Sequence, residues 1–150
     1  MATSATPRTP APIDPRGPRT NQGVLAVALG LGFVFSWWYV VPVFAVVLFL
    51  GAAFGPRFGP VIRFYGEVIR PRLAPPVELE DPRPPRFAAA VGVVFLTAAT
   101  VAFLAGATVL GWTLALIVAV LAALAAGTGI CVGCEIYLVV ARRRGVELAV

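Results

Sequence analysis

Cys131 and Cys134 are the two cysteines of this chain and the residues best suited to chemistry. On a helix, the Cys-x-x-Cys spacing puts both sulfur atoms on one face with Cα atoms roughly 5–6 Å apart, inside disulfide range. We therefore predict a pair that can cycle between dithiol and disulfide. The pKa of the first thiol falls if it lies at a helix N-terminus. If Gly127 and Gly129 break the helix, Cys131 starts a new one and becomes a nucleophile; in a continuous helix both thiols react slowly.

Glu135 follows the cysteine pair and has apolar sequence on both sides. An ionisable group at membrane depth is by default a functional candidate. A buried, protonated carboxyl could pass protons to or from a thiolate, so we name Glu135 as a third candidate catalytic residue. The alternative is that Glu135 lies near the inner headgroups and pairs with an arginine such as Arg142.

The same segment has a packing interpretation. Gly129-x-x-x-Gly133 is a helix-contact pattern, and cysteine can serve there as a small apolar residue. A zinc site would need two further ligands, which without histidine or another cysteine could come only from carboxylates or a second subunit. We predict neither a metal nor a cofactor.

The composition indicates a membrane protein. Hydrophobic residues make up 59% of the chain, the mean hydropathy is +0.91 and only 13% of residues are charged, against about a quarter in soluble domains. All 12 basic residues are arginine, so mechanisms that use histidine or lysine are excluded. The arginines flank apolar blocks instead of forming a patch with aromatic residues, so we expect no nucleic-acid partner. The Ala, Val, Gly, Pro and Arg enrichment is typical of a high-GC bacterium.

Two long apolar blocks must provide the elements that position the cysteines. The first, 24–54, would make a single helix of about 46 Å, too long for a hydrocarbon core of about 30 Å. Aromatic residues and Pro42 in its middle predict a hairpin with legs 21–38 and 40–54, of which the second could instead be re-entrant. The second block fits two spans, 87–107 and 112–140.

These spans predict an all-α membrane protein, a bundle of four transmembrane helices built from two tandem hairpins. The arginines lie outside the blocks and the hairpin tips carry no charge, so the positive-inside rule places both chain ends in the cytoplasm of a bacterial inner membrane. In the central loop, apolar residues recur at helical spacing and predict a short interfacial amphipathic helix: Val61, Ile62, Tyr65, Val68 and Ile69. The predicted segments are a disordered tail 1–20, a hairpin 21–54, a cytoplasmic loop 55–86, a hairpin 87–141 and a C-terminal tail 142–150.

An internal repeat supports two copies of one unit. Asp14-Pro-Arg-Gly-Pro-Arg aligns without gaps on Asp81-Pro-Arg-Pro-Pro-Arg, and each motif precedes one predicted hairpin. Because each copy crosses the membrane twice, we expect a pseudo-twofold axis along the membrane normal. Arg19 and Arg86 could reach lipid phosphates at the span boundary. The motif is either such an anchor or a docking surface for a cytosolic partner.

The Asp-Pro-Arg motifs and the segment Gly129-Ile-Cys-Val-Gly-Cys-Glu-Ile-Tyr137 together resemble the bacterial membrane family known as domain of unknown function 4395, over about residues 13–141. The resemblance implies membrane residence and paired cysteines at positions 131 and 134. It also implies a thioredoxin-like or sulfurtransferase partner in the cytosol. Our leading prediction is a membrane thiol protein, and the alternative is a non-catalytic scaffold or accessory subunit.

Overall fold

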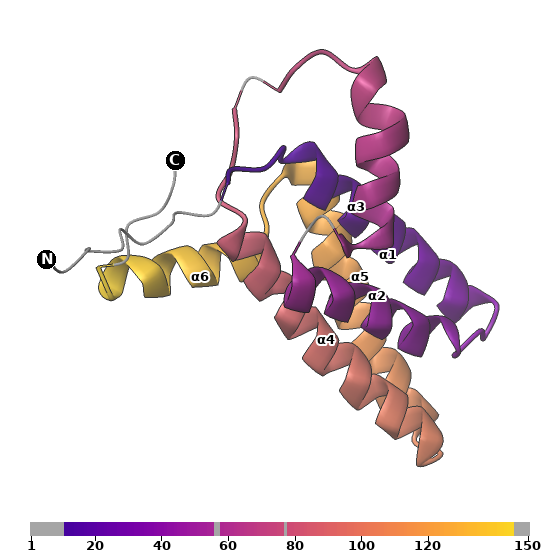
Figure 1. Cartoon of the computed structure of the whole chain (residues 1–150). Helices are drawn as coiled ribbons and strands as arrows, with labels where there is room; N and C mark the ends of the chain where they lie inside the picture. The colour runs from indigo at the N-terminus through magenta and orange to yellow at the C-terminus, as the bar shows by residue number, and fades with distance from the viewer. Residues whose placement is uncertain (1–10, 56–57, 77, 146–150) are drawn as a thin grey trace, which may run out of the picture.

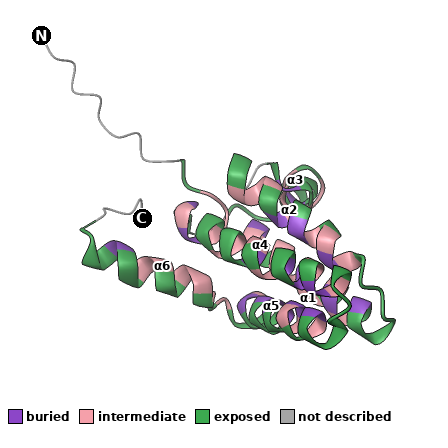
Figure 2. Cartoon of the chain, turned by 90° about the horizontal axis from the view of Figure 1, so that it is seen from below, coloured by how far each residue is buried: buried purple, intermediate pink, exposed green. Residues whose placement is uncertain are grey.

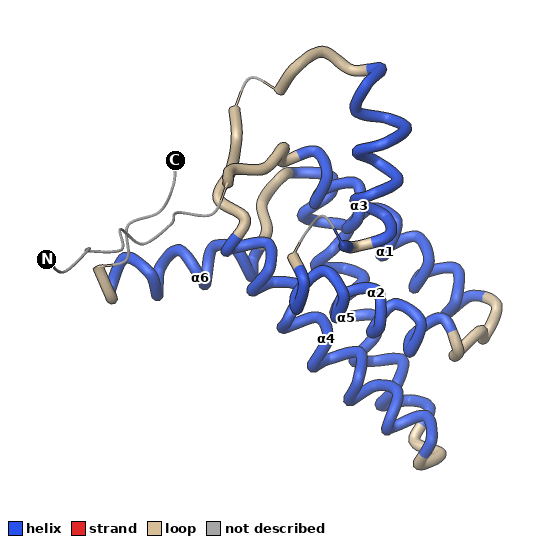
Figure 3. The backbone as a smooth tube through the Cα atoms, in the orientation of Figure 1, coloured by secondary structure: helices blue, strands red, loops and turns tan. Residues whose placement is uncertain are grey.

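The computed structural model describes residues 11–55, 58–76 and 78–145, and this part of the chain is helical (Figure 1). Figure 3 shows no strand in the described residues, and the extended backbone there forms a single isolated bridge. A π-helical turn, Tyr65–Ile69, and a 3-10 turn, Arg70–Arg72, continue the third helix. The α-helices are α1 (Arg16–Val34), α2 (Val40–Phe54), α3 (Pro60–Phe64), α4 (Arg83–Leu104), α5 (Thr108–Thr128) and α6 (Val132–Arg143).

The two copies of the repeat start α1 and α4 in the same way. Asp14 Oδ1 accepts a hydrogen bond of 2.9 Å from the backbone N–H of Arg16, and Asp81 Oδ1 accepts one of 2.8 Å from Arg83. These aspartates satisfy amide groups that have no partner within the first helical turn. Because Asp-Pro sets the helix start, α1 begins at Arg16, within the segment predicted as tail. Residues 1–10 and 146–150 of the predicted tails lie outside the described residues.

The bridge joins equivalent residues of the two copies. Ile13 and Glu80, each one residue before the repeat's aspartate, exchange two backbone hydrogen bonds of 2.9 Å in an antiparallel pair. An antiparallel pair that exchanges both bonds has local twofold symmetry. The bridge itself therefore has local twofold symmetry, with one equivalent residue from each copy on either side.

The helices pair across the two copies, α1 with α5 and α2 with α4, while α4 also packs against α5 (Figures 1 and 2). Small side chains at the contacts allow close approach, as they do between helices in lipid. The core consists mainly of Leu25, Leu29, Val41, Ala45, Leu48, Leu96, Ala99, Ala115, Ala119 and Ala122.

Both hairpins point the same way. Near the tips, the Trp112 ring lies 5.5 Å from Phe33 and 5.1 Å from Phe103, measured between ring centroids. At the opposite end of the bundle, Arg86 at the start of α4 donates hydrogen bonds of 3.0 and 3.1 Å to the carbonyl oxygens of Ala52 and Ala53 in α2. Arg86 thus neutralises the C-terminal end of α2, and its predicted contact with lipid phosphates stays a prediction.

Two helices, α4 and α5, are long and apolar enough to cross a membrane. Only 22% of the apolar window in α4 and 33% of that in α5 is buried, whereas the core helix of a soluble protein is mostly buried. Figure 2 shows exposed residues along the outer faces of these helices. Length and composition thus indicate membrane association. α2 is apolar but shorter, and the first turns of α1 are polar, so the predicted count of four spans is not confirmed.

The central segment is helical, as its spacing predicts, and it packs on α1. Tyr65 is buried, and its ring lies beside Gly17. The Tyr65 hydroxyl donates a hydrogen bond of 3.3 Å to Asp14 Oδ2. This contact ties the segment after α2 to the first copy of the repeat; its position at a membrane surface stays a prediction.

The predicted last span, 112–140, is interrupted. α5 ends at Thr128, Gly129 follows in the left-handed conformation with φ 78°, and α6 leaves the bundle in a different direction (Figure 1). Glycine adopts a positive φ without strain and often ends helices. The break falls at Gly129, while Gly127 lies inside α5.

Replacement of Gly111 in the tip cluster will destabilise the bundle. A Cβ atom there would lie 2.9 Å from three carbons of the rigid Phe103 ring, so Gly111→Ala should lower the free energy of unfolding by about 1–3 kcal/mol. Gly30→Ala is the matched control, because its Cβ meets nothing within 4 Å and alanine favours a helix. The free energy of unfolding of both variants is measured in mixed detergent micelles. Equal stability of the two variants would contradict the close contact between Gly111 and Phe103.

Candidate functional site: a dithiol at the start of α6

Cys131 caps the N-terminus of α6. Its backbone is extended, with φ −97° and ψ 107°, and its Sγ accepts a hydrogen bond of 3.4 Å from the backbone N–H of Cys134. The structure therefore follows the first of our two alternatives, because the chain breaks and Cys131 starts a new helix. A thiolate at this position is stabilised by the amides and the dipole of the helix.

The two thiols have opposite electrostatic environments. The pKa of Cys131 is lowered to about 6, chiefly by a hydrogen bond from the Cys134 thiol and against the effect of burial, with further help from the Cys134 amide and from Gln22. The pKa of Cys134 is raised because it donates to Cys131, is partly buried, and lies near Cys131, Glu80 and Glu135. Both thiols are half-buried and free. Cys131 is thus the more readily ionised thiol of the pair.

Glu135 lies in the first turn of α6, and its side chain is exposed. An acidic group there is favoured by the helix dipole, as are Arg142 and Arg143 in the last turn. The ion pairs found within residues 11–55, 58–76 and 78–145 do not include Glu135, so the predicted pairing with Arg142 is not seen. Its effect at the site is to raise the pKa of Cys134.

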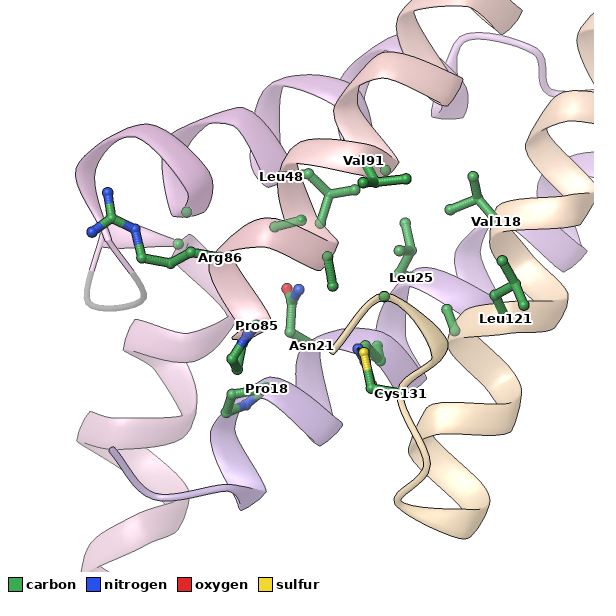
Figure 4. Close-up of a pocket in the computed structure, with 18 of the residues that line it drawn as sticks. Pro18, Asn21, Leu25, Leu48, Pro85, Arg86, Val91, Val118, Leu121 and Cys131 are labelled. Carbon is green, nitrogen blue, oxygen red and sulfur yellow. Dashed lines mark hydrogen bonds between the residues drawn. The ribbon is translucent and has the colours of Figure 1, made fainter. Parts of the chain in front are cut away.

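A cavity of about 140 Å³ opens beside Cys131, between the two copies of the repeat (Figure 4). Pairs of equivalent residues line it from both sides, one member from each copy. α2 and α5 complete its walls with apolar side chains such as Leu48 and Leu121. The equivalent lining pairs are Pro18 with Pro85, Asn21 with Ala88, Gln22 with Ala89, and Leu25 with Gly92.

The polar lining groups of this cavity are unequally divided between the copies. The first copy contributes Asn21 and Gln22 where the second has alanines. The Gln22 amide donates a hydrogen bond to Cys131 Sγ at 3.6 Å. Our sequence analysis did not find Gln22, although this polar pair at the start of an apolar helix, absent from the second copy, is a signal that points to it.

Loss of the Gln22 amide will raise the pKa of Cys131. A hydrogen bond is worth about 0.5–1.5 kcal/mol, so Gln22→Leu should move the pKa upward by up to about one unit. The pH dependence of Cys131 alkylation in the Cys134→Ser background measures the shift. Asn21→Leu, an adjacent change in the same cavity, is the control and should leave the profile in place; identical profiles for both variants would contradict a role for the Gln22 amide.

The packing interpretation also has structural support. A Cβ atom at Gly133 would lie 2.8 Å from Ala88 Cβ and 3.1 Å from Ala88 Cα, so α6 meets α4 at backbone distance.

The described residues contain no cluster of three or more metal-ligating side chains.

Fold and site together define a helical protein with two helices, α4 and α5, that are long and apolar enough to cross a membrane, and with a dithiol at a helix N-terminus beside an apolar cavity. Residues 13–142 match the family model described as a domain of unknown function, DUF4395. The chain belongs to this family, as the resemblance predicted. Neither curated proteins nor solved structures give a match.

Proposed function

We propose that this protein is a membrane thiol-disulfide protein in which Cys131 and Cys134 cycle between dithiol and disulfide. The observation that carries the proposal is the position of Cys131 as the N-cap of α6, with its Sγ bonded to the Cys134 amide. The low pKa of Cys131 provides a thiolate at neutral pH. Glu135, exposed next to Cys134, can pass a proton between the Cys134 thiol and water.

We further propose that α1, α2, α4 and α5 all cross a bacterial inner membrane. The support is the parallel arrangement of the hairpins, the uncharged aromatic tips at one end and the arginines at the other. In this topology both chain ends are cytoplasmic. The dithiol then lies close to the inner leaflet, just beyond the end of α5.

A cytosolic partner fits this location. Both thiols are half-buried and therefore open in part to solvent. We propose a thioredoxin-like or sulfurtransferase protein, which would exchange electrons or a sulfur atom with Cys131. This part of the proposal depends on the family resemblance and on the position of the thiol.

Mass-tagged maleimide applied to native membranes tests the redox cycle. We expect no tag on the pair after isolation under oxidant and two tags after treatment with a reductant. Cys131→Ala and Cys134→Ala should each abolish the reductant-dependent change. A pair that stays fully reduced under oxidant would refute the cycle.

A second candidate function is a non-catalytic scaffold, favoured by the close contact between Gly133 and Ala88. The scaffold predicts that Cys131→Ala is silent while Gly133→Leu disrupts assembly or stability. The thiol protein predicts loss of function in both variants. Comparison of the two phenotypes in the native host separates the candidates.

A further inference from the structure

The cavity beside Cys131 has the size and character of a site for a small ring. Its volume is about 140 Å³, and an engineered cavity of about 150 Å³ with apolar walls binds benzene in another protein. The apolar side chains come from all four long helices, among them Leu48, Phe95 and Leu121. An apolar ring therefore gains by leaving water for this space.

The end of the cavity nearest to α6 is polar. Asn21, Gln22 and Cys131 contribute hydrogen-bonding groups there, and the labelled Asn21 and Cys131 side chains lie near one another in Figure 4. Arg86 also lines the cavity, and its Nε and Nη2 groups donate to the Ala52 and Ala53 carbonyls at the end of α2. The site thus offers neutral amide donors to a ring oxygen. It offers little to a strongly hydrated anion, because most of its wall is apolar.

We infer that this cavity binds the head group of a membrane quinone, which is the oxidant of the Cys131–Cys134 dithiol. A quinone is an apolar ring with two carbonyl oxygens and accepts two electrons, the number that a dithiol releases. The Asn21 and Gln22 amides can donate to one of those carbonyls. This inference names the substrate class of the proposed thiol site, and so it depends on the proposed function.

The step is balanced as follows. The Cys131 thiolate adds to the quinone ring and forms a carbon–sulfur bond. The Cys134 sulfur then attacks Cys131 Sγ, forms the disulfide and breaks that bond, and the hydroquinone leaves with the electron pair. The quinol needs two protons. The Cys134 thiol supplies one, and solvent supplies the other, which balances the proton that the Cys131 thiol released when it ionised. Dithiol plus quinone thus gives disulfide plus quinol. Of the two cysteines, only Cys131 is among the residues that line the cavity. This agrees with the role of Cys131 as the sulfur that attacks the quinone.

The full-length protein in lipid nanodiscs tests this inference. The reduced protein is mixed with a ubiquinone that carries one isoprene unit, and quinol formation is followed together with the loss of maleimide-reactive thiols. We expect one quinol for each disulfide. Ala89→Phe puts a ring into the cavity, and it should slow quinone reduction by about tenfold or more, equivalent to roughly 1.4 kcal/mol. Ala90→Phe, on the exposed side of α4, is the matched control and should react like the wild type.

Oxidation by hydroxyethyl disulfide, which is soluble in water, separates the inference from the proposed function. Ala89→Phe should keep its rate with this oxidant, which also shows that the variant is folded. Oxidation of the wild type by the soluble disulfide but not by quinone would overturn the quinone site and leave the thiol cycle standing. Oxidation by neither reagent would overturn both.

A binding measurement on the wild type covers the case in which Ala89→Phe fails to fold. The quinol form of the same ubiquinone cannot oxidise the thiols, but it should occupy the cavity and slow maleimide labelling of Cys131. Labelling at an unchanged rate in saturating quinol would overturn the inference. Equal quinone reduction by folded Ala89→Phe and Ala90→Phe would do the same.

Discussion

At pH 7, the Cys131 thiol of a Cys134→Ser variant will react with iodoacetamide on the order of 10²-fold faster than the Cys134 thiol of a Cys131→Ser variant. With a pKa of about 6, Cys131 is about nine-tenths thiolate at this pH. Partial burial and the nearby Glu80 and Glu135, which the Cys131→Ser variant keeps, also raise the pKa of Cys134, so this thiol remains mostly protonated. Serine keeps a hydroxyl donor in place of the second thiol. Alkylation rates measured by mass spectrometry give the ratio.

The pH dependence of the same reaction gives an independent check. A thiol reacts as the thiolate, so the Cys131 rate should rise with pH through about 6 and become constant above neutrality. A thiol with an unshifted pKa, about 8.5, would continue to rise well above neutral pH. Similar rates for the two thiols, or an ordinary inflection for Cys131, would show that the cap does not stabilise a thiolate.

Gly129→Val will remove the high reactivity of Cys131. Gly129 has φ 78°, a conformation that costs a residue with a side chain about 1–2 kcal/mol and a β-branched residue more. Its Cβ would also lie 2.9 Å from Arg19 Nη2. Relief of this strain requires a different path between α5 and α6, so the Cys131 cap is lost. We expect the alkylation rate at pH 7 to fall by about tenfold, as the pKa returns toward the value of a free thiol.

Gly127→Ala provides the matched control for this prediction. Gly127 lies within α5, and a Cβ atom there meets nothing within 4 Å. Alanine should therefore leave Cys131 reactivity unchanged and add about 0.5–1 kcal/mol of helix stability. Circular dichroism shows whether both variants retain their helices. Retention of fast alkylation in Gly129→Val would mean that the left-handed turn does not position the thiol.

The sequence was sufficient to predict the helical hairpins, and to give a helix break before Cys131 as one of two alternatives, because both depend on local signals. Pro42 and the tip aromatics locate the first turn, and Gly129 is a residue type that ends helices. Asp14 and Asp81 of the repeat start α1 and α4 in the same way, by accepting from equivalent amides.

Contacts between distant segments could not be predicted in this way. The cavity exists because α1, α2, α4 and α5 converge on it, and the Gln22 bond to Cys131 joins residues that are 109 positions apart. The direction of α6 depends on two backbone angles at Gly129 and on its contact with Ala88. The spacing of apolar residues along the chain does not predict these contacts or the direction of α6, because a continuous helix and a broken helix can have the same sequence pattern.

The pairing of Ile13 with Glu80 bears on the origin of the chain. Equivalent residues that exchange hydrogen bonds across an axis form the interface expected of a homodimer, so an ancestral gene that encoded one hairpin could have assembled as two identical subunits before duplication and fusion. Such a dimer would have two identical half-sites. The present halves differ, because the first carries the amides of Asn21 and Gln22 and the second carries the cysteines, so that the two units share one site.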